Sequence, residues 1–322
     1  MNRILSYSLR LIVLPLCCLL LFFGCTRAQQ PSIAILSAGV DAGEYASVEE
    51  SQLLSAAEKA ELNAVALDTD PQELEQLIED ENLHALIICL SASQQAETYI
   101  EAARSSLTPI IFCGAAPDEE TMLGYDQCWY IGSSPQSEGE LLGQTLFECY
   151  KSGQIPDKNG DKLLQTLVVT KESTASDRIF SVLRIFENQG IYSDDPIVFC
   201  TEDASQDIAA ALSETLLANP QTDLVLIEDS SVVGSVLPVC EEQGVGAALL
   251  GADAGTVQTE DTRLLACSGF DLEDAAKLIV TYAANAASGK DPADGTGERM
   301  SEFRFTVLEP MILSQTQMSS EE

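Results

Sequence analysis

The sequence predicts an α/β protein of two doubly wound lobes, each a parallel sheet with helices on both faces. From residue 32 onward, short apolar runs rich in β-branched residues alternate with longer stretches of helical periodicity. This alternation is typical of βαβ units. Most of the short runs are apolar on both faces, as in the strands of a buried parallel sheet. About ten such strands exceed one comfortable sheet, so two sheets are expected.

The elements follow one another in a regular order. The expected strands are Ile33–Ser37, Ala64–Asp68, Ala85–Leu90, Pro109–Cys113, Cys128–Gly132, Thr166–Thr170, Ile197–Cys200, Leu224–Ile227, Ala247–Gly251 and Leu265–Ser268. The expected helices between them are Val48–Leu62, Pro71–Asp80, Gln94–Ser106, Gln136–Ser152, Ala175–Gln189, Gln206–Ala218, Val232–Gln243 and Leu272–Ser288. Parallel strands joined by helices require right-handed crossovers. Because open sheets of this kind bind ligands at the carboxyl ends of their strands, two facing lobes would form a ligand cleft.

The composition excludes several classes of partner. The chain has 322 residues, with 16 Lys+Arg against 51 Asp+Glu and a formal net charge of -35. A charge of this sign repels nucleic acid and anionic membrane surfaces, so no nucleic-acid partner is expected. Since 46% of the residues are hydrophobic and only 21% are charged, the chain is not a disordered acidic tail. We expect a folded globule with an acidic surface.

Residues 1–24 have the features of an export signal. Basic residues precede the apolar run Leu11–Phe23, and a small glycine then leads into Cys25. This junction resembles the lipobox of bacterial lipoproteins, in which the cysteine is diacylated and becomes the new first residue. An uncleaved signal anchor is the alternative, but the run is short for a membrane span and contains Pro15. We expect a lipoprotein exported to the outer face of the cytoplasmic membrane, held only by lipid on Cys25 and a tether over residues 25–31.

The remaining cysteines and the motif content argue against metal chemistry and catalysis. Seven cysteines follow Cys25, so they cannot all pair. Most lie in apolar strand-like runs, where cysteine behaves as a small buried hydrophobe, and no CxxC or Cys/His cluster has metal spacing. We expect mostly free thiols. The sequence contains no GxxxxGK[ST], HExxH or GxSxG motif and a single histidine, His84, so no enzymatic activity and no catalytic residues are expected.

Several segments together carry a resemblance to a known family. They are Tyr125–Ser133 (YDQCWYIGS), Pro156–Lys162 (PDKNGDK), Arg178 thirteen residues before Ile191, Gly251–Asp253 (GAD) and Ser288–Thr296 (SGKDPADGT). In this order they are similar to the galactose/glucose-binding members of the type I periplasmic binding proteins, over about residues 33–296. These proteins are the substrate-binding subunits of sugar ABC transporters.

The resemblance implies a particular division of the chain. The two lobes would be joined by a three-strand hinge, with crossings near Ser133, Gly269 and Arg299. The expected division is residues 32–133 and 271–298 for the N-terminal lobe, residues 134–270 and 299–313 for the C-terminal lobe, and a disordered tail over 314–322. Closing the hinge around a small ligand would be the working motion.

The resemblance also implies which side chains meet the ligand. Asp41 is similar in position to a sugar-binding aspartate and Tyr45 to a stacking aromatic, while Arg178 and Asp253 match an arginine and an aspartate that hydrogen-bond the sugar. Other positions depart from the family's usual residues and stay candidates: Cys89, Thr174, Glu202, and Glu228 or Asp229. Each carboxylate has an alternative role, because an Asp or Glu after a strand commonly caps a helix.

The chemistry of these candidates suits a polar ligand. Sugar hydroxyls need carboxylates to accept protons, an arginine to donate and aromatic rings against the ring faces. The predicted cleft is more acidic than a neutral hexose requires, and an amino sugar or other cationic solute would suit its charge better.

The loop from residue 157 to 165 has the spacing of a calcium loop. Oxygen-bearing side chains stand at its first, third, fifth and ninth positions, and a carbonyl is available at the seventh. The family carries a calcium site here, so the resemblance implies the ligands Asp157, Asn159, Asp161, Leu163, Gln165 and the distant Asp223. The alternative is a polar turn that joins a helix to a strand. Apart from this structural Ca²⁺, no cofactor is expected.

Together these observations predict a monomeric, lipid-anchored solute-binding subunit of an ABC importer. It would capture a small polar ligand, a sugar or an amino sugar, and pass it to separate permease and ATPase subunits. The alternative is a lipid-anchored sensory or scaffold domain whose pocket has diverged and which is not coupled to transport. A glycosidase would need two carboxylates facing each other across the cleft, and nothing in the spacing favours one.

Overall fold

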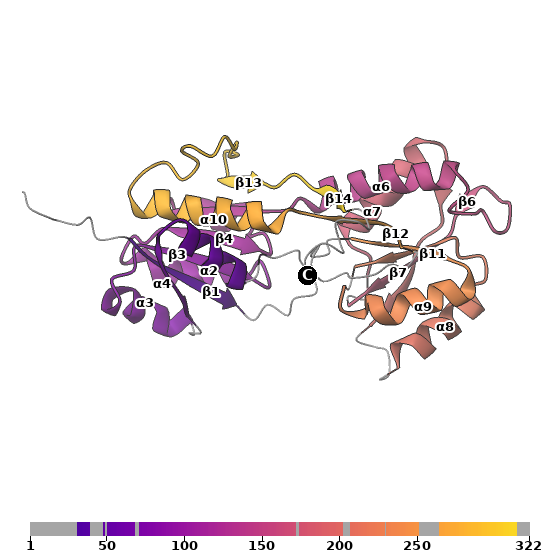
Figure 1. Cartoon of the computed structure of the whole chain (residues 1–322), viewed down its shortest axis with the longest axis horizontal. Helices are drawn as coiled ribbons and strands as arrows, with labels where there is room; N and C mark the ends of the chain where they lie inside the picture. The colour runs from indigo at the N-terminus through magenta and orange to yellow at the C-terminus, as the bar shows by residue number, and fades with distance from the viewer. Residues whose placement is uncertain are drawn as a thin grey trace, which may run out of the picture.

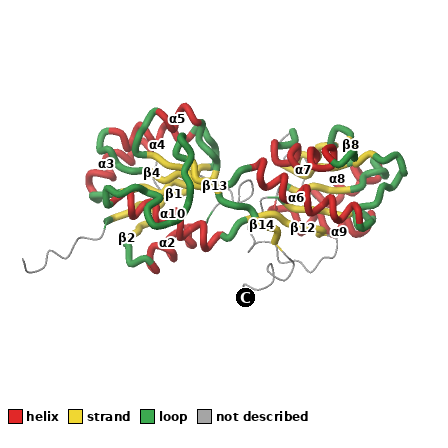
Figure 2. Tube along the Cα trace, turned by 90° about the horizontal axis from the view of Figure 1, so that it is seen from above, coloured by secondary structure: helices red, strands yellow, loops and turns green. Residues whose placement is uncertain are grey.

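The computed structural model describes residues 31–38, 48, 50–67, 71–171, 174–201, 207–228, 230–250 and 264–313. Figures 1 and 2 show two lobes lying side by side along the long axis, each with helices packed on a central sheet. The predicted fold class, two doubly wound parallel-sheet lobes joined by three crossings, is confirmed.

The first lobe is built on a six-stranded parallel sheet in the order β13-β5-β4-β3-β1-β2. Its elements are β1 (Ser32–Ala38), α2 (Glu50–Lys59), β2 (Asn63–Leu67), α3 (Pro71–Asp80), β3 (Ala85–Leu90), α4 (Gln95–Arg104), β4 (Ile110–Gly114), α5 (Glu119–Leu123), β5 (Cys128–Gly132), α10 (Leu272–Ala287) and β13 (Phe305–Val307). Alternate strand residues face opposite cores: Ile33 and Ile35 pack with α2 and α10, whereas Ala34 and Leu36 pack with α3 and α4. The sheet is therefore buried on both faces.

The second lobe repeats this architecture with the order β14-β12-β11-β10-β7-β9, in which only β14 is antiparallel. Its elements are α6 (Pro135–Lys151), β7 (Thr166–Thr170), α7 (Asp177–Asn188), β9 (Ile197–Cys200), α8 (Ile208–Ala218), β10 (Leu224–Ile227), the 3-10 turn η1 (Ser230–Val232), α9 (Val233–Gln243), β11 (Gly246–Leu249), β12 (Leu264–Gly269) and β14 (Met311–Leu313). One face of the sheet packs on α6 and α7 and the other on α8 and α9. A separate two-stranded sheet joins β6 (Leu163–Leu164) to β8 (Tyr192–Ser193).

All the strands and helices expected from the apolar pattern are present, within a few residues at each end. The elements that the pattern did not reveal are short: α5, β6, β8, β13 and β14. Each has five residues or fewer, and such segments depend on tertiary contacts rather than on their own periodicity. Among the helices of the described ranges, none has the length and apolar character needed to cross a membrane.

The chain makes its first crossing between β5 and α6 and its second between β12 and α10. Each ends at a capped helix: the Ser134 side chain accepts a hydrogen bond from Ser137 N (3.2 Å) at the start of α6, and Asp271 accepts one from Asp274 N (2.9 Å) at the start of α10. Capping oxygens satisfy free amide groups of the first turn, so these residues define where the connecting strand stops and the helix begins.

The third crossing differs from the expected position near Arg299. Strand β13 pairs in parallel with β5 and so belongs to the first lobe, whereas β14 pairs with β12 of the second lobe. The chain therefore crosses between Val307 and Met311. Residues 299–307, which the sequence assigned to the C-terminal lobe, stay with the N-terminal lobe because one arginine fastens them there.

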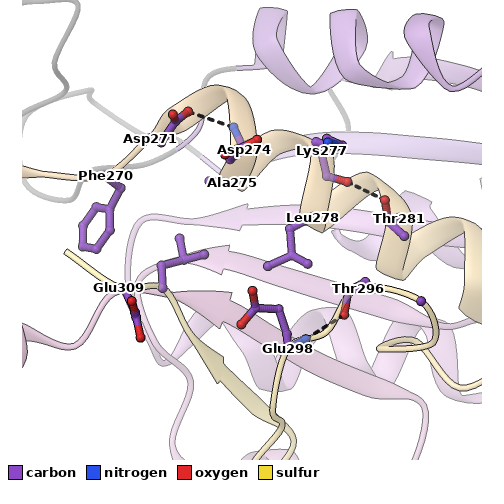
Figure 3. A pocket seen from close by; sticks show the side chains of 12 residues that line it. Phe270, Asp271, Asp274, Ala275, Lys277, Leu278, Thr281, Thr296, Glu298 and Glu309 are labelled. Atoms are coloured by element: carbon purple, nitrogen blue, oxygen red, sulfur yellow. Dashed lines mark hydrogen bonds between the residues drawn. The ribbon is translucent and has the colours of Figure 1, made fainter. Parts of the chain in front are cut away.

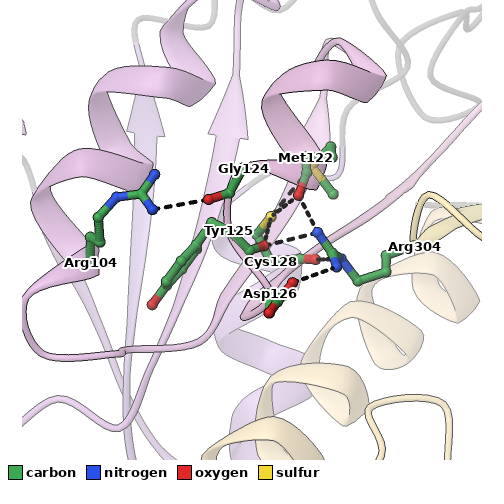
Figure 4. A network of polar contacts seen from close by, with 7 residues as sticks. All are labelled: Arg104, Met122, Gly124, Tyr125, Asp126, Cys128 and Arg304. Atoms are coloured by element: carbon green, nitrogen blue, oxygen red, sulfur yellow. Dashed lines mark hydrogen bonds and ion pairs between the residues drawn. The ribbon is translucent and has the colours of Figure 1, made fainter.

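Arg304 makes this attachment (Figure 4). Its Nε donates to the carbonyl oxygen of Cys128 at 2.9 Å, and its Nη2 donates to the carbonyl oxygens of Tyr125 (2.9 Å) and Met122. Nη1 lies 3.5 Å from an Asp126 carboxylate oxygen, a longer contact at an exposed aspartate. The guanidinium thus binds three carbonyl groups of the segment leading into β5, and β13 continues directly from it.

Replacing Arg304 by alanine is expected to destabilise the protein by about 2 kcal/mol, because hydrogen bonds from a charged donor contribute about 1.5–3 kcal/mol. Urea unfolding measures the change, and hydrogen exchange should show the amides of β13 losing protection first. Arg299→Ala is the matched control, since Arg299 is exposed on the same returning segment. Equal stability of the two variants would contradict the role given to Arg304.

Candidate functional site

Two of the described candidates, Arg178 and Glu228, meet at the carboxyl edge of the second sheet. Arg178 is the second residue of α7, the helix that follows β7, and Glu228 comes directly after β10. Strands β7 and β10 are neighbours in the sheet, so these two side chains approach each other from adjacent connections. Two further residues complete the group, Ser176 before α7 and Glu138 in the first turn of α6. We call Glu138, Ser176, Arg178 and Glu228 the carboxylate–arginine cluster.

Arg178 is buried against Glu138. The Arg178 Nε lies 2.7 Å from Glu138 Oε2, and the two side chains are 6% and 0% exposed. Neither of these two atoms has a hydrogen-bond partner in the structure. The contact is therefore an ion pair set by proximity. Glu138 lies only a few residues after Ser133, so it links the arginine to the first crossing.

Gly139 makes this approach of α6 to α7 possible. A Cβ atom at Gly139 would lie 2.2 Å from the carbonyl oxygen of Arg178 and 2.7 Å from the Cβ of Ser181. Both contacts are shorter than any side chain tolerates, so only glycine lets the two helices come this close. The position of Arg178 therefore depends on a glycine in the neighbouring helix.

Ser176 joins Glu228 to the start of α7. Its hydroxyl oxygen accepts hydrogen bonds from the backbone N–H groups of Arg178 (3.2 Å) and Ile179 (3.4 Å), and its O–H donates to Glu228 Oε1. The serine thus caps the helix and orients the carboxylate at once. Glu228 Oε2 is buried and has no hydrogen-bond partner in the structure. A buried acceptor without a donor is costly, and a donor from a ligand would remove that cost.

The cluster carries more negative than positive charge. Burial raises the pKa of Glu138, an effect that Arg178 opposes and that Glu228 reinforces. Burial also raises the pKa of Glu228, opposed first by the hydrogen bond from Ser176 and then by Arg178. Two carboxylates share one guanidinium, so the fully ionised cluster has an excess of one negative charge.

The other predicted ligand contacts divide into two groups. Thr174 is exposed in the connection before α7. Cys89 is 2% exposed and packs in the apolar core beneath α2 and α10, so the structure places its thiol inside the first lobe rather than on a cleft surface. The remaining candidates lie outside the described residues: Asp41, Tyr45, Glu202, Asp229 and Asp253. Cys25, the predicted lipidation site, also lies outside them.

Two members of the cluster were not predicted. Ser176 has a recognisable signal, because a serine immediately before a helical pattern is a preferred cap. Glu138 has none, since an acidic residue in the first turn of a helix is usually a solvent-exposed partner of the helix dipole. Its burial becomes visible only when α6 and α7 are packed together.

The predicted calcium loop is closed by its own hydrogen bonds. Asp157 accepts from the amides of Gly160 (2.7 Å) and Lys162 (3.0 Å). Asp161 accepts from the amide of Leu163 (2.8 Å) and from the side-chain nitrogens of Asn159 (2.8 Å) and Gln165 (2.9 Å). The backbone hydrogen bond from Leu163 is the main reason why the pKa of Asp161 is lowered.

Asp223 performs a similar task from the start of β10. It is fully buried and accepts hydrogen bonds from the amides of Lys158 (2.9 Å) and Gln165 (3.0 Å), and burial raises its pKa. The oxygen-rich donor set has the chemistry that calcium prefers, but its arrangement does not fit the ion. Within the described ranges no three Asp, Glu, His or Cys residues are placed to hold a metal, and two amide nitrogens point at Asp161.

The two expectations for this loop can be separated by melting the protein with calcium or with a chelator. The arrangement of the loop predicts the same melting temperature in both, because its carboxylates are already satisfied. The resemblance predicts a higher melting temperature in calcium, since a ligand that binds only the folded state stabilises it. A rise of several degrees that Asp161→Asn abolishes would overturn the geometric prediction.

Two cavities lie on the flank of the first lobe. One of about 450 Å³ runs between α10 and the returning segment, from Phe270 and Asp271 at the second crossing to Leu308 and Glu309 at the third (Figure 3). Another of about 690 Å³ lies between α2 and α10. Neither cavity is lined by a member of the carboxylate–arginine cluster, although the first includes Phe270 and Leu308, which directly follow β12 and β13.

The comparisons with known proteins agree with the fold. No protein-family model matches the chain. The D-galactose/methyl-galactoside binding periplasmic protein MglB of Haemophilus influenzae is 24% identical over 244 residues, which cover 73% of this chain and 72% of that protein. An ABC transporter solute binding protein from Bacillus halodurans with bound myo-inositol has a TM-score of 0.64 at 15% identity, covering 91% of this chain and 98% of its own.

A second solved structure gives the same result. An ABC transporter periplasmic solute binding protein from Actinobacillus succinogenes with bound D-allose has a TM-score of 0.64 at 13% identity, covering 90% of this chain and 99% of its own. The chain therefore has the fold of the type I periplasmic binding proteins, and the resemblance seen in the sequence is confirmed at that level.

Proposed function

We propose that this protein is a solute-binding subunit of an ABC importer that captures a small hydroxylated ligand, a sugar or an amino sugar, between its lobes. The observation that carries the proposal is the carboxylate–arginine cluster at the carboxyl edge of the second sheet. It combines a guanidinium, which donates, with a carboxylate oxygen of Glu228 that is buried and lacks a donor. Hydroxyl groups both accept and donate, so a polyol can use both groups.

Two further observations support the proposal. The relatives that share the fold over most of its length bind galactosides, allose or inositol, as their names state. The cluster also lies close to the first crossing, since Glu138 stands in the first turn of α6, directly after that crossing, and pairs with Arg178. A ligand that engages Arg178 would thereby act on the connection about which the lobes turn. The chemistry is reversible binding with closure rather than catalysis.

The proposal extends to the location of the protein. The export signal predicted from the sequence and the cysteine at residue 25 support lipid anchoring outside the cytoplasmic membrane, where the protein would act as a monomer close to separate permease and ATPase subunits. Cell fractionation tests this part: Cys25→Ala should move the chain out of the membrane fraction, and an unchanged distribution would contradict lipid anchoring.

A thermal-shift screen tests the binding function. The panel is D-galactose, D-allose, myo-inositol, D-galactosamine and D-galacturonate, each at millimolar concentration. At least one neutral member is expected to raise the melting temperature, because ligand at 100 times Kd adds about 2.7 kcal/mol of stability. The excess negative charge predicts that the amino sugar shifts the melting temperature at least as much as galactose and that the anionic galacturonate does not. No shift with any neutral or cationic member would contradict the proposal and favour a diverged pocket.

A further inference from the structure

Two cysteines of the first lobe face each other in adjacent strands. Cys89 in β3 and Cys113 in β4 are register partners in the parallel ladder, and their sulfur atoms lie 3.0 Å apart. Both side chains are 2% exposed. The separation is about half an ångström less than the usual contact distance between heavy atoms that are not bonded. The shared register and the orientation of the two side chains therefore place the two buried thiols in close contact.

The backbone geometry is compatible with a disulfide at this place. Neighbouring strands lie about 4.8 Å apart, and disulfides join residues whose Cα atoms are about 4.4–6.8 Å apart. Register partners on adjacent strands fall within this range. The sulfur atoms already point toward each other, so a bond of about 2.05 Å requires them to approach by about 1 Å. Small changes of the two side-chain torsions supply this movement without a shift of the sheet.

Three of the other described cysteines direct their thiols at backbone carbonyl groups. The Cys128 thiol donates to the Tyr125 carbonyl at 3.0 Å, the Cys200 thiol to the Lys171 carbonyl at 3.0 Å and the Cys267 thiol to the Ser268 carbonyl at 3.6 Å. Cys89 and Cys113 also contact carbonyl groups, those of Val48 (3.9 Å) and Ile88 (3.8 Å), but these contacts are longer than the sulfur–sulfur contact. The Cys89–Cys113 pair is thus the candidate for a disulfide because of where the two sulfur atoms lie, and not because the chain contains many cysteines.

We propose that Cys89 and Cys113 form a reversible disulfide that ties β3 to β4 near the carboxyl edge of the first sheet. The oxidant is a small-molecule disulfide such as oxidised glutathione. One thiolate attacks it, forming a mixed disulfide and releasing one glutathione thiolate, and the second cysteine then displaces the other. The two cysteines lose two protons and two electrons, and the glutathione disulfide gains them to become two thiols.

The burial of both cysteines makes the pair slow to exchange in either direction. Thiol exchange needs a thiolate, and the pKa of the Cys113 thiol is raised well above its usual value by its contact with Cys89 and by burial. The bond would close a segment with a sequence separation of 24 residues, which restricts the unfolded chain and raises the melting temperature of the oxidised form.

Thiol counting on the purified full chain tests the proposal. The folded protein is incubated with oxidised glutathione, denatured, alkylated with iodoacetamide and weighed by mass spectrometry. The oxidised wild type is expected to lose two alkylatable thiols relative to the reduced protein, and digestion should give one linked pair of peptides containing Cys89 and Cys113. Dithiothreitol should restore both thiols, and the oxidised form should melt several degrees higher.

Variants that each lack one cysteine provide the controls. Cys89→Ala and Cys113→Ala should each lose no thiol pair, although the partner thiol remains. Cys267→Ala removes a buried thiol of the second lobe and should lose two thiols as the wild type does. Circular dichroism of each reduced variant establishes that it is folded. Retention of both thiols in the oxidised wild type, or linkage of either cysteine to a different one, overturns the proposal.

Discussion

Replacing Arg178 by methionine is expected to lower the free energy of unfolding by about 3–5 kcal/mol at neutral pH. This is the usual cost of removing one partner from a buried ion pair, because the remaining charge stays buried without compensation. Here two carboxylates, Glu138 and Glu228, would remain. Methionine keeps the length and apolar stem of the side chain, so packing changes little. Urea unfolding at neutral pH measures the loss.

The pH dependence of the stability loss shows whether uncompensated buried charge causes it. The pKa values of Glu138 and Glu228 are raised from 4.5, so the folded state holds their protons more tightly than the unfolded state does. Such groups contribute stability that is present below their ordinary pKa and is lost as the pH rises through the raised value. Without Arg178 both pKa values rise further. The deficit of the variant should therefore shrink as the pH falls toward 4.5.

A second substitution provides the matched control. Glu138→Gln keeps the shape of the side chain and leaves Arg178 beside Glu228, so it is expected to destabilise the protein far less than Arg178→Met does. In the double variant glutamine should recover part of the stability that Arg178→Met loses, because one buried charge is gone. A deficit for Arg178→Met that is independent of pH, and that Glu138→Gln does not reduce, would show that lost packing is the cause.

Replacing Gly139 by alanine is expected to lower the free energy of unfolding by about 3 kcal/mol and to weaken ligand binding. The added Cβ would lie 2.2 Å from the Arg178 carbonyl oxygen, which is backbone and cannot rotate away. Helices α6 and α7 must separate, and overpacking of this kind costs about 1–3 kcal/mol or more. Because Arg178 belongs to the displaced turn, urea unfolding and the thermal shift by the best ligand should both decline.

Gly234→Ala is the matched control for this change. Gly234 lies inside α9 and an added Cβ would meet no heavy atom within 4 Å. Alanine has the higher helix propensity, so this variant should be as stable as the wild type or up to about 1 kcal/mol more stable. If Gly139→Ala is as stable as Gly234→Ala, the tight contact between α6 and α7 does not position Arg178.

The long elements of this fold are predictable because their periodicity is set by burial. A strand such as β3 is buried at every position, and α10 places a continuous apolar stripe on the sheet, so both leave a pattern in the sequence. The third crossing leaves no such pattern. It depends on the hydrogen bonds of Arg304 to carbonyl groups about 180 residues earlier in the chain, and no local signal reports a contact at that distance.

The candidate site likewise contains residues that the sequence predicts and residues that it does not. Arg178 and Glu228 could be predicted as candidates because each stands where the resembling family has a ligand-binding residue, and both connections lie at the edge where such sheets bind ligands. Glu138 could not, because its partner becomes a neighbour only through the close packing that Gly139 permits. Cys89 follows the rule for position but not for direction: it lies near the end of β3, yet its side chain faces the core under α2. The position of a residue along a strand predicts which edge of the sheet it lies near. The alternation of side chains along the strand decides which face of the sheet its side chain points to.

Small-angle X-ray scattering with and without the ligand that gives the largest thermal shift tests the central claim most directly. If the lobes close around the ligand, the radius of gyration should fall on binding, and Arg178→Met should abolish the decrease at the same ligand concentration. A radius of gyration that stays constant while the wild type is saturated would contradict capture between the lobes.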